Sequence, residues 1–137
     1  MFSSEAARTL LLAAQGLGSP PGHPATRDDV IDAIRRMGVL QIDSISVVAR
    51  SPYLVLWSRL GSYEPRWLDE LLAEGALFEY WSHAACFIPI EDYGLYRRLM
   101  IEGGEKTRTW MQAHHEAIEH VMERIREKGP VRAAEFA

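Results

Sequence analysis

Apolar residues recur at helical spacing near the N-terminus, and the polar residues between them indicate where helices begin and end. Ser3 or Ser4 is suited to cap a first helix. Residues 16–24 are rich in glycine and proline, so they predict a surface loop. Thr26 is suited to cap a second helix, which Gly38 would end. The pattern therefore predicts two helices separated by a loop.

The middle of the chain alternates between β-prone and helical segments. Residues 39–42 form a short β-prone run, and residues 51–61 predict a helix with proline in its first turn. A further helix ends at Gly75, and residues 77–80 and 85–90 have the composition of two paired strands. The order helix, strand, helix, turn, helix and strand pair is typical of a winged helix, a helix-turn-helix variant with a hairpin wing.

The last third of the chain is helical in pattern. Glu91 is expected to open one helix, and a long helix is expected to follow Gly103-Gly104 and to end at Gly129-Pro130. Residues 131–137 begin a further element that is too short to bury itself. We therefore expect the chain to be the N-terminal part of a longer protein.

These segments define the predicted organisation. The expected fold class is α+β, mostly α: a winged helix-turn-helix with additional flanking helices. The predicted parts are an N-terminal helix and loop over residues 1–27, a winged-helix domain over 28–90, connecting helices over 91–128 and the start of a further domain over 129–137.

Composition narrows the class of protein. The chain has 137 residues, 47% hydrophobic and 25% charged, which is ordinary for a globular domain. A single cysteine, Cys86, excludes an internal disulfide framework, and no apolar run reaches the roughly 20 residues of a membrane span. With no signal-peptide pattern at the N-terminus, we expect a cytoplasmic protein. The net charge of −4 argues against broad phosphate binding, so any DNA contact must come from local arginines.

Two polar residues stand out in the first β-prone run. Gln41 and Asp43 are separated by one residue, so on a strand they would share a face, about 7 Å apart. A carboxylate there can orient or deprotonate a water and stabilise positive charge on a sugar, and an amide can hold that water. The alternative from spacing alone is that both are solvated strand residues, or that Asp43 caps the next turn through Ser44.

Three segments together resemble one family. Residues 36–45 (RMGVLQIDSI), 54–61 (LVLWSRLG) and 77–85 (LFEYWSHAA) look like the YcaQ-like DNA glycosylases, which are related to AlkZ-type enzymes. The family's active-site motif is glutamine, an apolar residue and aspartate, which Gln41-Ile42-Asp43 matches. Members are built from tandem winged helices and run to several hundred residues. A lesion-probing hairpin lies in a part of the family that this chain does not include.

The resemblance implies a function. Members hydrolyse the N-glycosidic bond of bulky N-alkylated purines, including interstrand crosslinks, without a cofactor. Gln41 and Asp43 would be the catalytic pair, and the partner would be double-stranded DNA carrying alkylated purines. The full-length enzyme is expected to be a monofunctional bacterial glycosylase that works as a monomer on the nucleoid.

Other residues are candidates for DNA contact. Trp81 and His83 lie in an aromatic segment and would stack on or line a lesion pocket; the alternative is that Phe78 and Trp81 are core and His83 caps a turn. Arg66, early in the predicted recognition helix, is the favoured phosphate ligand. Four other arginines could serve as well, or be plain surface charges: Arg35, Arg36, Arg50 and Arg59.

No metal site is expected. His114, His115 and His120 do not have the spacing of a zinc-protease motif, and Cys86 has no second cysteine to pair with as a ligand. Two other functions stay open: a non-enzymatic winged-helix DNA-binding module, and an interaction domain without chemistry. Against the first, the predicted recognition helix carries three acidic residues and only Arg66 at its start, whereas a groove reader presents Arg, Lys, Asn or Gln.

Overall fold

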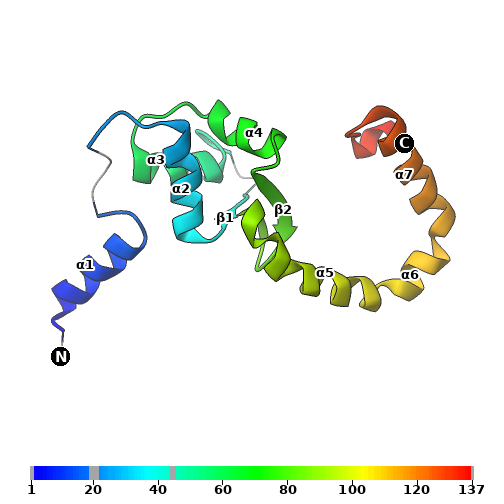
Figure 1. Ribbon diagram of the computed structural model, residues 1–137, viewed down its shortest axis with the longest axis horizontal. Coiled ribbons are helices and arrows are strands. Elements are labelled where there is room, and N and C mark those ends of the chain that lie inside the picture. The colour runs from blue at the N-terminus through cyan, green and yellow to red at the C-terminus, as the bar shows by residue number, and fades with distance from the viewer. Residues whose placement is uncertain (1, 19–21, 44–45, 137) are drawn as a thin grey trace. The chain divides into compact units, whose positions relative to one another are not determined.

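The structure is a computed structural model that describes residues 2–18, 22–43 and 46–136. The chain divides into two compact units, Met1–Gly94 and Leu95–Ala137. Helices dominate and one three-stranded antiparallel sheet is present in the described ranges, so the predicted class, α+β and mostly α, is confirmed (Figure 1). No helix in those ranges is long and apolar enough to cross a membrane.

The elements of the first unit follow the predicted order. They are α1 (Ser4–Ala14), α2 (Arg27–Met37), β1 (Leu40–Gln41), α3 (Ser51–Leu60), α4 (Arg66–Ala73), β2 (Leu77–Trp81), β3 (Ala85–Pro89) and the 3₁₀ helix η1 (Ile90–Asp92). This is the order that a winged helix requires; the assignment to that fold stays a prediction.

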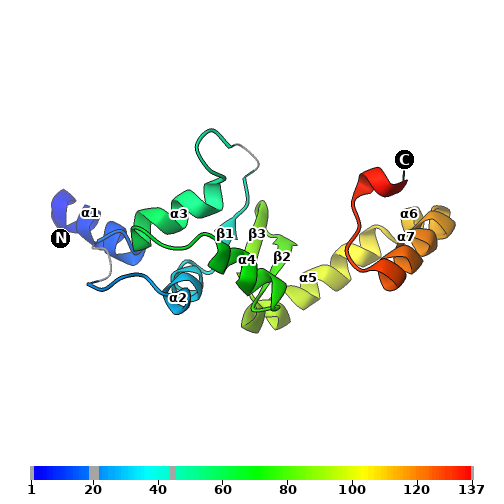
Figure 2. The same ribbon diagram turned by 90° about the horizontal axis from the view of Figure 1, so that it is seen from above.

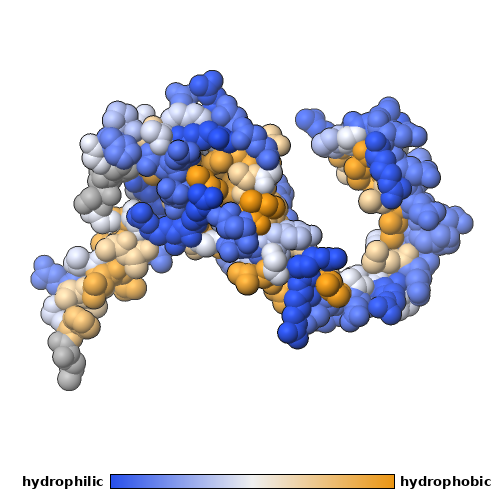
Figure 3. All heavy atoms as spheres, in the orientation of Figure 1, coloured by the Kyte–Doolittle hydropathy of each residue, from blue (hydrophilic) through white to orange (hydrophobic). Residues whose placement is uncertain are grey.

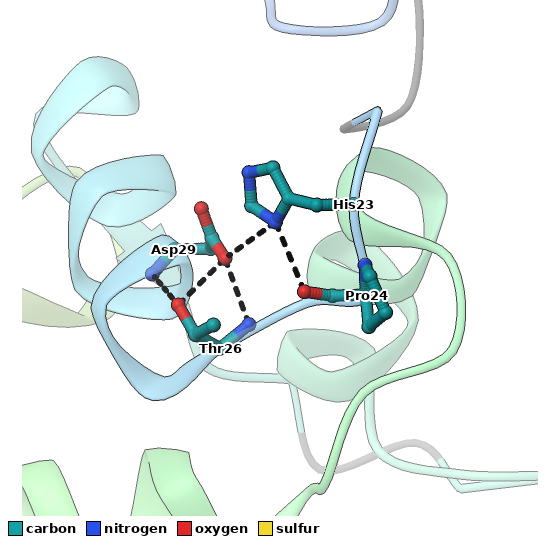
Figure 4. Close-up of polar contacts among 4 residues, drawn as sticks. All are labelled: His23, Pro24, Thr26 and Asp29. Carbon is teal, nitrogen blue, oxygen red and sulfur yellow. Dashed lines mark hydrogen bonds and ion pairs between the residues drawn. The ribbon is translucent and has the colours of Figure 1, made fainter.

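The predicted starts of α1 and α2 and the predicted end of α2 are confirmed by their caps, whereas α4 ends at Ala73, two residues before the predicted Gly75. The Ser3 hydroxyl accepts a hydrogen bond from the Ala6 N–H at the start of α1. At α2, Thr26 and Asp29 form a reciprocal capping box, in which Thr26 donates to the Asp29 carboxylate through its backbone N–H and its hydroxyl (Figure 4). These bonds lower the pKa of the Asp29 carboxyl. Gly38 ends α2 with a φ of 79°, a left-handed conformation that favours glycine.

The sheet has the order β1-β3-β2, with antiparallel pairing throughout. Leu40 pairs with Phe87 and Gln41 with Cys86, while Tyr80 faces Cys86 from the other side. The strand β1 is shorter than the predicted run over residues 39–42. The Ile42 N–H still donates to the Ala85 carbonyl at 2.8 Å, but regular pairing ends at Gln41. β1 is therefore a short edge strand.

One apolar core holds the first unit together. α2 packs against α3, α4 and β3, and β1 packs against α3. The core side chains come from every one of these elements and from β2: Val30, Ile31, Ile34, Leu40, Leu56, Leu60, Leu68, Leu71, Leu77 and Phe87. Outside this core, the apolar side chains Leu10, Leu11 and Leu12 of α1 are exposed, and Figure 3 shows apolar atoms along that helix.

The last third of the chain departs from the prediction of one helix opened by Glu91 and a long helix after Gly103-Gly104. Glu91 lies in η1, and α5 (Tyr93–Lys106) begins at Tyr93. The second unit comprises most of α5, with α6 (Arg108–Ala113), α7 (His115–Lys128) and the 3₁₀ helix η2 (Ala133–Phe136). α5 runs through Gly103-Gly104, and the predicted long helix is broken instead at Thr107 and at His114, whose backbones are not helical. The His115 Nδ1 lies 3.3 Å from the Gln112 carbonyl oxygen, which Glu116 would use in a continuous helix. Ala137 lies outside the described residues.

Candidate active site

Gln41 lies at the exposed edge of the sheet. It is the last residue of β1, and β3 occupies the other side of that strand. Its neighbour Leu40 is only 1% exposed and enters the core, whereas Gln41 itself is exposed. Successive strand residues point to opposite faces, so burial of Leu40 fixes the outward direction of the Gln41 amide. The predicted separation of core and polar positions in this run is thus present in the structure.

The turn between β2 and β3 brings a histidine to this amide. The His83 Nε2 lies 3.3 Å from the Gln41 Oε1, although the two residues are 42 positions apart in the sequence. The turn is closed by a hydrogen bond from the Ser82 N–H to the Ala84 carbonyl at 2.9 Å. In the tautomer with its hydrogen on Nε2, the imidazole donates to the amide oxygen. In that arrangement the NH₂ group of the Gln41 amide points away from His83.

Asp43 lies just beyond the end of β1. The prediction that Gln41 and Asp43 share one regular strand is wrong in this respect, because strand pairing ends before Asp43. The bond from the Ile42 N–H to Ala85 nevertheless holds the intervening residue against the sheet. Asp43 is half-buried, which distinguishes it from a freely solvated carboxylate. The alternative cap through Ser44 falls outside the described residues.

Trp81 is the last residue of β2, directly before the turn. It pairs with Ala85, and its side chain is 72% exposed. The alternative in which Trp81 belongs to the core is therefore wrong. Phe78, by contrast, is half-buried and contacts Tyr93 edge to face, with ring centroids 5.4 Å apart. Trp81 thus exposes an aromatic side chain on the same hairpin that carries His83.

Arg66 lies at the start of α4 and faces acidic residues. Its Nε is 3.8 Å from the Glu64 carboxylate and 3.9 Å from that of Glu70. Both pairs are exposed, so each contributes little to stability. They do, however, reduce the positive potential that a phosphate would meet at Arg66. No hydrogen bond or ion pair joins Arg66 to Gln41 or His83 in the described part of the chain.

The other candidate arginines differ in availability. Arg35 bonds to Asp32 and to Glu91, with its Nε 2.6 Å from the Glu91 carboxylate; these bonds raise the pKa of Arg35. Arg59 is half-buried and donates to the Val55 carbonyl, and burial lowers its pKa. Arg36 and Arg50 are exposed. Sequence position alone gave no means of separating these four.

A cavity of about 260 Å³ lies elsewhere in the first unit, along α2 and beside the C-terminal end of α3. Its polar lining includes Arg36, Arg59, His23 and Asp29. Figure 4 shows the last two of these residues. None of Gln41, Asp43, Trp81 and His83 lines it. Asp29 is engaged in the capping box, which gives this residue a structural role. We place the candidate site at Gln41 because its polar groups converge on an exposed edge that a large substrate can reach.

The structure also contains a polar cluster that sequence reasoning missed. The Tyr53 hydroxyl donates to the Asp69 carboxylate at 2.7 Å, and the Tyr63 hydroxyl donates to the Tyr53 carbonyl at 3.2 Å. Burial raises the pKa of Tyr63 to about 12. Both phenols therefore stay protonated at neutral pH and tie α3 to α4 and its preceding turn. No spacing signal in the sequence marks these pairs.

Metal and thiol chemistry find no support at this site. In the ranges that the structure describes, no three His, Cys, Asp or Glu residues are grouped to hold a metal ion. Cys86 pairs with Gln41 across the sheet, but its side chain is buried, and burial raises the pKa of its thiol. A buried, protonated thiol is a poor nucleophile.

One comparison with known proteins bears on the site. The family model described as "DNA glycosylase AlkZ-like" matches residues 34–137, about three quarters of the chain. The match includes the Gln41-Ile42-Asp43 segment, the hairpin with Trp81 and His83, and the whole second unit. No solved structure gives a significant match to the chain.

Proposed function

The chain belongs to the AlkZ-like DNA glycosylase family, and on that basis we propose that it hydrolyses the N-glycosidic bond of N-alkylated purines in duplex DNA, including bulky and crosslinked lesions. Gln41 and Asp43 are the proposed catalytic pair. The observation that carries the proposal is that the family match includes Gln41, whose amide is exposed, and Asp43, whose carboxylate is half-buried.

The proposed reaction needs little acid catalysis. An N7-alkylated purine already carries a positive charge, so it departs as a neutral base with the electrons of the glycosidic bond. Positive charge then develops on the sugar, and the Asp43 carboxylate stabilises it. Water adds to the anomeric carbon and gives a proton to Asp43, which releases it to solvent. The products are the free base and an abasic site.

Gln41 has a distinct role in this scheme. Its Oε1 faces His83, so its NH₂ group is available to donate to the oxygen of the attacking water. Asp43 would accept a hydrogen from the same water. His83 acts as a positioning residue, because its contact with Oε1 selects one of the two amide orientations. Trp81, exposed on the same hairpin, offers an aromatic face for a base or sugar.

The geometry of α4 disfavours the alternative of a sequence-reading regulator. A recognition helix reads base edges with Arg, Lys, Asn or Gln. In α4, Arg66 lies near Glu64 and Glu70, and Asp69 accepts the Tyr53 hydrogen bond. These acidic residues would repel the phosphates beside a major groove. The site at β1 and the hairpin is a better candidate for DNA contact.

The direct test is base release under single-turnover conditions. The natural protein is incubated with duplex DNA that carries one N7-methylguanine, and in parallel with DNA that carries a nitrogen-mustard interstrand crosslink. From the N7-methylguanine duplex we expect the free alkylated base and an abasic site. From the crosslinked duplex we expect an abasic site on one strand, with the excised base still joined to the guanine of the other strand until that bond is cleaved too. Undamaged guanine should stay intact. Binding to the damaged duplex without base release would overturn the proposal in favour of a non-enzymatic DNA-binding module.

Replacing His83 tests the positioning role. His83→Ala removes one hydrogen bond to Gln41, and a net bond of about 0.5–1.5 kcal/mol corresponds to a rate loss of roughly 2–13-fold. His83→Gln keeps an N–H donor at similar reach and should restore most of the rate. The measurement is the single-turnover rate beside the Kd for the same DNA. If His83→Ala weakens DNA binding but leaves the excision rate of the bound substrate unchanged, His83 is a DNA-contacting residue instead.

A further inference from the structure

The loop that leads from β1 into α3 presents two adjacent valines to solvent. Val47 is 91% exposed and Val48 is 89% exposed, the highest exposures among the large hydrophobic residues that the structure describes. The part of this loop next to α3 projects beyond the start of the helix (Figure 2). Single exposed apolar residues are common on proteins, but two neighbours at a projecting tip form a feature that requires an explanation.

The backbone of this loop holds the valines at its tip. Ser46 and Arg50 form an isolated antiparallel bridge that closes the loop on either side of them. Residues 47–49 form the bend between the two bridged residues. Arg50 at the base is exposed and precedes α3 directly. The loop therefore has an apolar tip and a cationic residue at its base.

The loop is attached to the candidate active site. Only three residue steps separate Asp43 from Ser46, and three residues of chain span at most about 11 Å. Bases in a duplex stack at about 3.4 Å along each strand, so this reach corresponds to roughly three base steps. Trp81 is also strongly exposed, and it lies on the hairpin that contacts Gln41 through His83.

From this arrangement we propose that Val47 and Val48 form an apolar wedge that enters the base stack of duplex DNA beside the lesion. Apolar side chains that insert between base steps unstack them and kink the duplex. Arg50 would meet the phosphate backbone next to the wedge, as expected for a cation at the base of a projecting loop. The proposal rests on the proposed glycosylase function and extends it, because it explains how a stacked lesion becomes accessible to Gln41 and Asp43.

The test compares paired and unstacked substrates. In the natural protein, the double variant Val47→Ser/Val48→Ser keeps small side chains at the tip but removes their apolar groups; Val47→Leu/Val48→Leu keeps the tip apolar. Each is assayed on N7-methylguanine in a fully paired duplex and in a single-nucleotide bulge, where the base is already partly unstacked. A 2-aminopurine beside the lesion reports unstacking by its fluorescence, and thermal melting reports folding.

The expected result is selective. The serine variant should lose about 10–100-fold in excision rate on the paired duplex and less than about 3-fold on the bulge, because only the paired substrate needs to be opened. It should also lose the fluorescence increase, and the leucine variant should retain both signals. Equal losses on both substrates with a lower melting temperature or a changed oligomeric state would show that the valines pack against protein, either elsewhere in the natural chain or in a second copy, and would overturn the proposal. An unchanged serine variant would do the same. Absence of any excision by the unmodified protein would instead overturn the proposed function.

Discussion

Replacing Asp43 by Asn is expected to lower the single-turnover rate of base excision by about 10²–10³-fold, a loss of roughly 3–4 kcal/mol of transition-state stabilisation. The substitution preserves the size and shape of the side chain and removes its negative charge. In the proposed mechanism that charge faces the developing sugar cation and accepts the proton of the water. The substrate ground state carries its positive charge on the base instead, so binding should change much less than the rate.

The control for this prediction is Gln41→Ala, which leaves the carboxylate in place. It removes the amide that holds the water and should cost less than Asp43→Asn, because the charge that stabilises the sugar remains. Both proteins should melt near the temperature of the unmodified protein, since Gln41 is exposed and neither side chain belongs to the core. A well-folded Asp43→Asn protein with full activity would remove Asp43 from the mechanism. Loss of activity through unfolding would make Asp43 a structural residue.

The sequence predicted those features that depend on neighbouring residues. Ser3 and Thr26 mark helix starts because their side chains satisfy N–H groups three positions away, and Gly38 marks an end because it adopts a positive φ. The alternation of Leu40 and Gln41 separated core from surface for the same reason, since adjacent strand residues face opposite sides. Local geometry alone accounts for each of these predictions.

The features that the sequence did not predict depend on contacts between distant residues or on competition for one group. No local pattern reports that the β2–β3 turn places His83 against Gln41. The acidic neighbours of Arg66 were visible as composition, but their distances from its Nε were not. The break between α6 and α7 lies at His114, beside a contact of the His115 ring with the Gln112 carbonyl, and the apolar spacing continues across it. The extent of β1 depended on its partner strand as well as on its own residues.

The site depends on the core beneath it, and Leu56 is the side chain through which this dependence is best measured. Leu56 lies on α3 with 0% exposure and belongs to the cluster that also contains Leu40, the neighbour of Gln41. Since α3 also packs against α2 and β1, a cavity at Leu56 would lower the stability of the fold that holds the strand with the Gln41 amide. α3 also follows directly after the loop that carries Val47 and Val48.

Leu56→Ala is therefore expected to reduce the free energy of unfolding by about 2–5 kcal/mol, the range for removal of a buried leucine side chain that leaves a cavity. Leu54→Ala is the matched control: the same substitution on the same helix at a position that is 44% exposed. Exposed substitutions usually change stability by less than about 0.5 kcal/mol, so the difference between the two variants measures burial and cancels helix propensity. Urea unfolding followed by circular dichroism gives both values.

Equal losses for Leu54→Ala and Leu56→Ala would contradict the packing of α3, and a Leu56→Ala protein as stable as the unmodified one would exclude Leu56 from the core. Because the catalytic groups are untouched, the Leu56→Ala protein that remains folded at low temperature should excise at nearly the unmodified rate, in contrast to Asp43→Asn, which should stay folded and lose its chemistry.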